Sequence, residues 1–212
     1  MTQAFDPIAD SYDQWYDAPE GRAVFSAELA CLRLLCTPCG GRSLEVGVGT
    51  GRFTSALGVA EGVDPSGQML EIAAGRGIQT YTGTAEDLPF ADDTFDGLLL
   101  ALTLCFVTDS ERAAMECRRV LRAQARLLVG HIPADSSWGR HYEEKKATGH
   151  PVYSHARFLT TAQVVALIEG AGFRLAGAAS TLFWAPGAVP ETQPRVEAGI
   201  VPGVGFVGLL FT

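Results

Sequence analysis

Hydrophobic residues along the chain form short continuous runs that alternate with longer stretches in which every third or fourth residue is apolar. Continuous runs bounded by turn residues predict buried strands, and the three-to-four spacing predicts amphipathic helices. Strands are predicted at residues 43–46, 59–63, 78–81, 95–101, 126–132, 173–183 and 204–211. Helices are predicted at residues 19–36, 52–57, 66–74, 110–122 and 160–171.

The order of these elements predicts the fold class. Strands that alternate with helices form βαβ units, so we expect an α/β fold with a Rossmann-like, doubly wound and mostly parallel sheet. The last two strands share a linker rich in glycine and proline, residues 185–203, which predicts an antiparallel C-terminal edge strand. Ligands of such sheets bind at the carboxyl ends of the strands.

Chain length and apolar runs bear on domain organisation. The 212 residues suit one domain over residues 1–212, with an N-terminal helical lid at 1–38 and an insertion at 133–159 that covers the active site. The longest apolar run, residues 98–107, has about half the length that a membrane span requires. No positively charged segment followed by an apolar one begins the chain, so we expect a cytoplasmic protein with no membrane partner.

The net charge of the chain indicates which class of substrate it binds. The net charge is −8, from 16 basic and 24 acidic residues. Nucleic-acid affinity comes mainly from neutralised phosphates and needs a basic patch. The basic cluster of Arg118, Arg119 and Arg122, with Arg126 nearby, lies at a predicted helix end, where cations favour the helix dipole. We expect a small-molecule substrate and no nucleic acid, with a protein substrate left open, and a monomer or homodimer.

Cysteine and histidine patterns indicate no metal site. The five cysteines are an odd number, and Cys36 and Cys39 form a C-x-x-C without a second such pair or a suitably spaced histidine pair. All four histidines lie between residues 131 and 155. We interpret Cys36 and Cys39 as incidental thiols at a helix end, with a redox or metal role as the alternative.

The segment Leu44-Glu45-Val46-Gly47-Val48-Gly49-Thr50-Gly51 joins the first predicted strand to a helix. Its glycines let the backbone turn tightly and approach a ligand, because no Cβ intervenes. The third glycine comes one residue earlier than in the G-x-G-x-x-G loop of dinucleotide-binding proteins. Asp64 ends the next strand, where a carboxylate accepts hydrogen bonds from both hydroxyls of a ribose. An acidic loop suits a cationic ligand, such as a sulfonium amino acid, better than a pyrophosphate.

Four stretches together resemble the class I S-adenosylmethionine-dependent methyltransferases, in particular the type 11 group that includes the ubiquinone and menaquinone biosynthesis methyltransferases. They are the glycine loop, residues 62–66 with Met69 and Leu70, residues 83–96, and residues 116–121, in family order between about 43 and 130. Two positions depart from the family pattern. Thr84 stands where an aspartate is common, and residues 122–125 replace a Pro-Gly-Gly turn.

The resemblance implies S-adenosylmethionine as cofactor, S-adenosylhomocysteine as product, and a role for each matching residue. Glu45 and the glycine backbone would flank the methionine part, Asp64 would hold the ribose, and Met69 would pack near the adenine. Ala85 and Glu86 would bind the adenine, and the backbone at Ala101 and Leu102 would hold the amino group. The residues expected to bind cofactor are therefore Tyr12, Glu45, Gly47, Gly49, Gly51, Asp64, Met69, Ala85, Glu86, Ala101 and Leu102.

Tyr12 enters that set because related proteins begin with a similar Tyr-Asp stretch that closes over the cofactor. Trp15 and Tyr16 are expected to line the acceptor pocket, or else to anchor the first helix. His131, at the end of a strand, is a candidate general base because a histidine titrates near neutral pH, and Tyr16 is the second catalytic candidate. Cys105 follows the fourth strand and is interpreted as a buried thiol.

The insertion supplies further aromatic and charged residues. Glu143, Glu144, Lys145 and Lys146 indicate a solvated helix face. Methyl transfer from a sulfonium is an in-line displacement, so the absence of a recognisable catalytic dyad does not exclude an enzyme.

Three functions compete at this point. The first is methyl transfer from S-adenosylmethionine to a small molecule. The second is a non-catalytic S-adenosylmethionine-binding regulatory module, which would keep the glycine loop and lack an acceptor pocket. The third is a nicotinamide-dependent oxidoreductase, against which the glycine spacing and Glu45 count.

Overall fold

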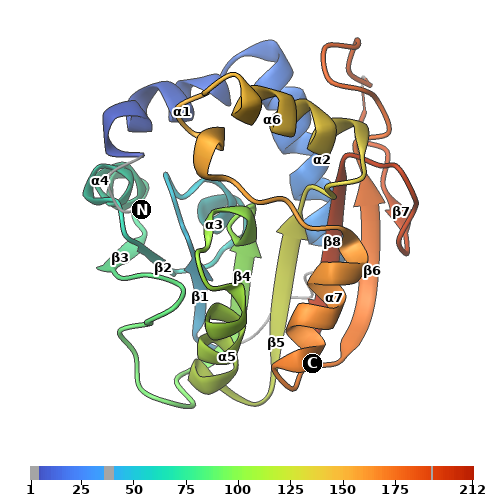
Figure 1. The fold of residues 1–212 in the computed structure, drawn as a ribbon. Coiled ribbons are helices and arrows are strands. Elements are labelled where there is room, and N and C mark those ends of the chain that lie inside the picture. Colours follow the sequence, from blue (N-terminus) through green and yellow to red (C-terminus); the bar gives the residue numbers. More distant parts are fainter. Residues whose placement is uncertain (1–4, 36–40, 192) are drawn as a thin grey trace.

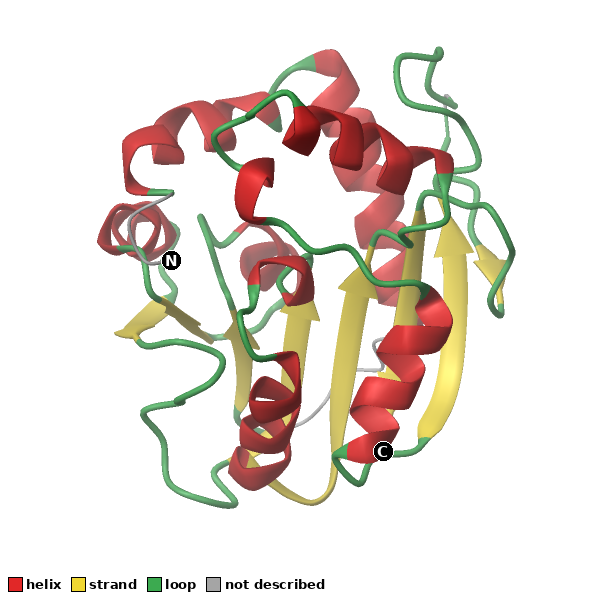
Figure 2. Cartoon of the chain, viewed as in Figure 1, coloured by secondary structure: helices red, strands yellow, loops and turns green. Residues whose placement is uncertain are grey.

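The computed structural model describes residues 5–35, 41–191 and 193–212, which form one eight-stranded sheet with helices on both faces (Figures 1 and 2). From one edge to the other the strands are β3 (Gln79–Thr82), β2 (Glu61–Asp64), β1 (Ser43–Val46), β4 (Phe95–Ala101), β5 (Leu121–His131), β8 (Phe206–Phe211), β6 (Leu175–Thr181) and β7 (Glu197–Ala198). The first five are mutually parallel, and the pairings β5–β8, β8–β6 and β6–β7 are antiparallel. The predicted Rossmann-like fold is confirmed.

Successive side chains of the central strands enter two different cores. Leu98 and Leu100 pack with α5 (Ser110–Val120) and α7 (Thr161–Gly170), whereas Leu99 and Ala101 pack with α2 (Pro19–Leu35) and α3 (Arg52–Leu57) on the opposite face. The short helix α4 (Gly67–Gly75) lies against β2 and β3. Because side chains alternate across a strand, a continuous apolar run is what a sheet covered on both faces requires.

The C-terminal strand β8 is antiparallel, as expected, but it is not the edge strand. It lies between β5 and β6, and the two-residue strand β7 forms that edge of the sheet. Phe206, Val207, Leu209 and Phe211 are fully buried. An apolar strand that packs on both faces is stable only inside the sheet, which leaves the edge to a short strand from the linker.

The largest boundary difference from the sequence prediction lies between α5 and β5. Helix α5 ends at Val120 rather than at residue 122, and β5 begins at Leu121 rather than at residue 126. Leu121 pairs with Phe95, and a register shift before the Gly97–Arg126 pair accommodates the extra residues, with Gln124 at φ +66°. The pairing and burial of Leu121 within the sheet therefore outweigh the helical pattern that runs through it.

Two segments lie above the carboxyl ends of the parallel strands (Figure 1). The first contains the 3₁₀ turn η1 (Asp6–Ile8) and α1 (Ala9–Trp15), and the second contains α6 (Ser137–Ala147) and the turn η3 (Tyr153–His155). Trp138 anchors α6, because its buried indole N–H donates to the Trp184 carbonyl at 2.6 Å.

The structure also bears on the cysteine pair, on metal binding and on membrane spans. Cys36 and Cys39 lie outside the described residues. Within the described part of the chain, three or more potential metal ligands do not come together at any point. None of the described helices is long and apolar enough to cross a membrane.

Candidate active site

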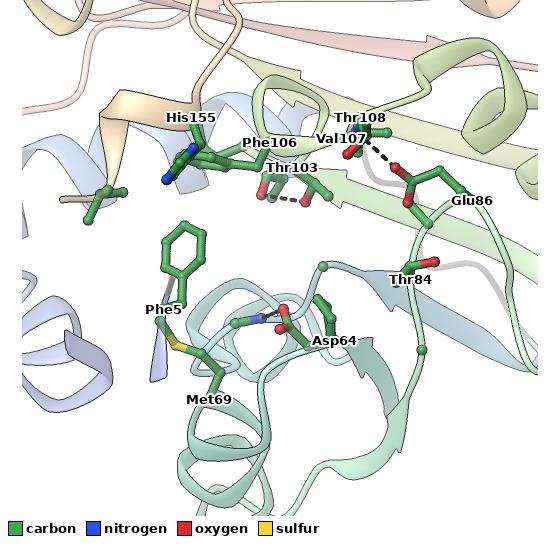
Figure 3. A pocket seen from close by; sticks show the side chains of 18 of the residues that line it. Phe5, Asp64, Met69, Thr84, Glu86, Thr103, Phe106, Val107, Thr108 and His155 are labelled. Carbon is green, nitrogen blue, oxygen red and sulfur yellow. Dashed lines mark hydrogen bonds between the residues drawn. The ribbon is translucent and has the colours of Figure 1, made fainter. Parts of the chain in front are cut away.

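A cavity of about 400 Å³ lies at the carboxyl ends of β1, β2 and β4. Its floor is built from the glycine loop, Asp64 and the segments 83–86 and 101–109, and Phe5 and Tyr12 reach it from the N-terminal segment. Figure 3 shows Asp64, Met69 and Glu86 around this space, with the Phe5 ring projecting between Met69 and His155. We call this space the first cavity.

The glycine loop takes a backbone path that other residues rarely adopt. Gly47, Gly49 and Gly51 have φ of +72°, +52° and +80°. A Cβ on Gly47 would stand 2.4 Å from Cγ2 of Thr103, whereas a Cβ on Gly49 would meet no atom within 4 Å. Gly47 is therefore needed for packing, and Gly49 keeps one side of the loop open at the cavity wall.

Asp64 ends β2 with its carboxylate at the wall of the first cavity. Oδ2 accepts the Gly49 N–H and Oδ1 accepts the Ser66 N–H, each at 2.9 Å. Burial raises the pKa of this carboxyl, and the two backbone hydrogen bonds oppose the rise. Both oxygens are thus oriented by backbone and retain lone pairs for a ligand.

The predicted residues Met69, Ala85, Glu86, Ala101 and Leu102 also line the first cavity. Glu86 Oε1 accepts the backbone N–H groups of Thr108 at 2.8 Å and Asp109 at 3.3 Å, which joins two loops at the rim. Leu102 has φ +59°, and its N–H donates to the Gly130 carbonyl. Such a backbone conformation is costly for leucine and is held by its surroundings.

Two predicted cofactor residues do not line the cavity. The Glu45 carboxylate is buried and accepts a hydrogen bond from the Thr54 hydroxyl of α3, on the far side of β1. Burial raises its pKa to about 8, against the hydrogen bonds from Thr54. Gly51 lies against Ile78 and Ala73. Both residues therefore pack on the side of the glycine loop that lies away from the first cavity.

A second cavity of about 380 Å³ adjoins the first. Tyr12, Leu102, Phe106 and Val152 line both spaces and form their common boundary. Five further aromatic side chains line the second cavity, from in and beside the two segments above the sheet: Trp15, Tyr16, Tyr142, Tyr153 and Phe158.

The tyrosines of the second cavity stay protonated at neutral pH. Burial raises the pKa of Tyr12 to about 12 and moves those of Tyr16, Tyr142 and Tyr153 further up. The hydroxyls of Tyr12 and Tyr16 are hydrogen-bonded at 3.1 Å. Tyr16 thus lines the second cavity as a neutral hydrogen-bonding group.

His131 does not line either large cavity. It is buried at the end of β5 beside a recess of about 20 Å³, with Nε2 3.3 Å from the Thr161 hydroxyl. Burial lowers its pKa to about 4, so it is neutral at pH 7. Cys105 lines the second cavity, and burial raises its pKa to about 12, so it is a thiol rather than a thiolate.

Sequence reasoning missed two charged residues of the second cavity. Glu28 of α2 is buried and lines it. Lys145 was assigned to a solvated helix face, yet it is half-buried, lines the cavity, and has Nζ 5.4 Å from the Tyr142 ring centre. The sequence does contain a sign that Glu28 is unusual. It is an acid at an apolar position of a helix, with Val24 and Leu32 one turn away on either side.

Comparisons with known proteins agree with this geometry. The model of the type 11 methyltransferase domain family matches residues 44–129. A solved structure of an S-adenosylmethionine-dependent methyltransferase from Thermotoga maritima, described as a possible histamine N-methyltransferase, is 37% identical. It superposes with a TM-score of 0.90 over 99% of this chain and 97% of that one.

Two relatives extend the comparison. An uncharacterised protein of Mycobacterium tuberculosis is 39% identical over 201 residues, which are 95% of this chain and 70% of that protein. A ubiquinone/menaquinone biosynthesis C-methyltransferase of Geotalea daltonii is 34% identical over 106 residues, 42% of this chain and 44% of that protein. The similarity to the mycobacterial protein therefore extends over nearly all of this chain.

Proposed function

The chain belongs to the type 11 S-adenosylmethionine-dependent methyltransferases, and from that we propose that it methylates a small molecule bound in the second cavity. Membership of this enzyme family removes the nicotinamide-dependent alternative.

The lining of the first cavity fits S-adenosylmethionine. The two carboxylate oxygens of Asp64 suit the two hydroxyls of a ribose, since each accepts a single backbone N–H. Met69 and Ala85 offer apolar surface for the adenine. The carboxylates Asp64 and Glu86 favour a ligand with a positive charge, which this cofactor carries on sulfur.

When bound, S-adenosylmethionine supplies a methyl group already activated by the positive sulfur, so an acceptor lone pair can take it by in-line displacement. The protein then has to align the acceptor and exclude water. We assign the alignment to the common boundary, where Tyr12, Leu102, Phe106 and Val152 face both cavities. This shared boundary is the observation that carries the proposal, because an acceptor in the second cavity would lie next to a cofactor in the first. The buried rings of Tyr16 and Tyr142 would help to exclude water.

The first test is calorimetric titration with S-adenosylmethionine and S-adenosylhomocysteine, with NADH as control. Methyl transfer is then followed as S-adenosylhomocysteine formed with a panel of amines, phenols, thiols and carboxylic acids. Amines enter the panel because the Thermotoga relative is described as a possible histamine N-methyltransferase.

A pair of variants separates the two cavities. Val24 lines only the second cavity, so the larger ring of Val24→Phe should narrow that cavity, strongly reduce transfer and leave cofactor affinity unchanged. Val24→Leu adds less volume and covers the case in which the larger ring disturbs folding. Undiminished transfer by a folded Val24→Phe protein would place the acceptor elsewhere.

A further inference from the structure

Glu28 occupies an unusual place for a carboxylate. It lies in the middle of α2, and its neighbours one turn away, Val24, Cys31 and Leu32, are buried apolar residues. The side chain is 2% exposed and lines the second cavity. Its Oε2 atom is enclosed and accepts no hydrogen bond from any described residue.

This arrangement lowers the stability of the protein. A buried acceptor without a donor loses its hydrogen bonds to water and regains none. Burial raises the pKa of the Glu28 carboxyl to about 8, and no cation of the described residues offsets this effect. A leucine or methionine would pack there without such a cost, so the site needs a donor from outside the chain.

The surroundings of Glu28 indicate which donor fits. Tyr12, Tyr16 and Tyr142 line the second cavity together with Glu28, so the three tyrosines and the carboxyl group border the same space. The faces of aromatic rings attract cations. Lys145 demonstrates this in the same cavity, with Nζ 5.4 Å from the Tyr142 ring centre and 5.8 Å from that of Tyr153.

We propose that the second cavity selects an amine as methyl acceptor and that Glu28 Oε2 binds the N–H of its reacting nitrogen. This inference rests on the proposed function, because it names the substrate class of the same cavity. A carboxylate and tyrosine rings together recognise an ammonium group, whereas an alcohol of the same shape brings neither the charge nor the additional N–H donors.

Glu28 also accounts for the proton. An ammonium nitrogen cannot attack, so a Glu28 carboxyl that is ionised when the amine binds takes one proton from nitrogen onto Oε2, and nitrogen keeps the electron pair. That pair forms the bond to the methyl carbon, while the pair of the broken carbon–sulfur bond stays on sulfur. In a cavity of low polarity the neutral amine and neutral carboxylic acid are favoured over the ion pair.

The test measures binding rather than turnover. The protein is saturated with S-adenosylhomocysteine and titrated with benzylamine, phenethylamine and cyclohexylmethylamine, each paired with the alcohol of the same shape. We expect at least one amine to bind at least tenfold more tightly than its alcohol. Glu28→Gln should lose this preference and still bind S-adenosylhomocysteine normally.

Glu20→Gln is the matched control, because Glu20 is an exposed glutamate in the first turn of the same helix. The control should keep the preference for the amine. The inference is overturned if no amine binds the unchanged protein, if alcohols bind as tightly as amines, or if Glu28→Gln keeps the preference. If the protein instead methylates a phenol or thiol, and Val24→Phe strongly reduces that transfer, the proposed function stands although this inference fails.

Discussion

The carboxylate of Asp13 on α1 accepts two hydrogen bonds from the guanidinium of Arg76, at 2.8 and 2.9 Å. Arg52, the first residue of α3, donates two more to the same carboxylate at 2.8 and 3.0 Å. Burial alone would raise the pKa of Asp13, but the hydrogen bonds from the two arginines lower it to about 2. This ion-pair cluster ties the segment that carries Tyr12 to the first residue of α3 and to the C-terminal end of α4.

Asp13→Asn should loosen that segment. The amide keeps one acceptor and loses the charge, so we expect faster limited proteolysis near residues 5–18 and an affinity for S-adenosylmethionine about fivefold lower, or about 1 kcal/mol. Asp10→Asn is the control, since Asp10 is exposed on the same helix. Equal cleavage rates and affinities in the two variants would show that the cluster does not hold the segment.

The two glycines Gly47 and Gly77 form a matched pair. Both have φ above +70°, but a Cβ on Gly47 would meet the Thr103 side chain, and one on Gly77 would meet nothing. Thr103 cannot swing aside freely, because its hydroxyl donates to the Val46 carbonyl at 3.0 Å. Urea unfolding should show Gly47→Ala to be less stable than Gly77→Ala by about 1–3 kcal/mol. Equal losses would mean that only the backbone conformation requires glycine at residue 47.

Sequence patterns were sufficient wherever a local rule decides the structure. The run from Phe95 to Ala101, apolar apart from Asp96, has the predicted bounds of β4. Ser66 caps α4 and Thr160 caps α7, with Gln163 completing a capping box. These features depend on residues within one turn or one strand, so the chain specifies them without tertiary information.

The direction of the side chains at strand ends could not be predicted from the sequence. Glu45 and Asp64 are both acids near the end of a strand, yet only Asp64 lines the first cavity. Alternation along β1 turns Glu45 toward α3, and Asp64 is the last residue of β2. Glu28 and Lys145 were missed for a similar reason, because the second cavity forms only when α2, α1 and α6 come together.

Asp64→Ala should weaken S-adenosylmethionine binding at least tenfold, or about 1.4 kcal/mol. The substitution removes the acceptors assigned to the ribose hydroxyls and the two bonds to Gly49 and Ser66. Calorimetric titration measures the change, and Asp87→Ala provides the control, since Asp87 is exposed on the following loop. Unchanged affinity in a folded Asp64→Ala protein would contradict the ribose assignment.

Glu28→Gln should stabilise the protein, and the gain should depend on pH. Burial raises the pKa of Glu28 to about 8 in the folded chain, whereas an unfolded glutamate has a pKa of about 4.3. Between these values the folded state holds a proton that the unfolded state releases, so the stability of the unchanged protein falls as pH rises. The glutamine variant escapes this loss.

Urea unfolding between pH 5 and pH 9 measures the difference between the two proteins. The advantage of Glu28→Gln in free energy of unfolding should grow from pH 5 to pH 8 and then level off. Tyr12, Tyr16 and Tyr142 around the carboxyl have pKa values raised to about 12 or above, so they do not titrate in this range. Lys145 and His150 face the cavity in both proteins and cancel in the comparison. A difference that is constant with pH, or a glutamine variant less stable at pH 8, would show that Glu28 is not an uncompensated buried acid.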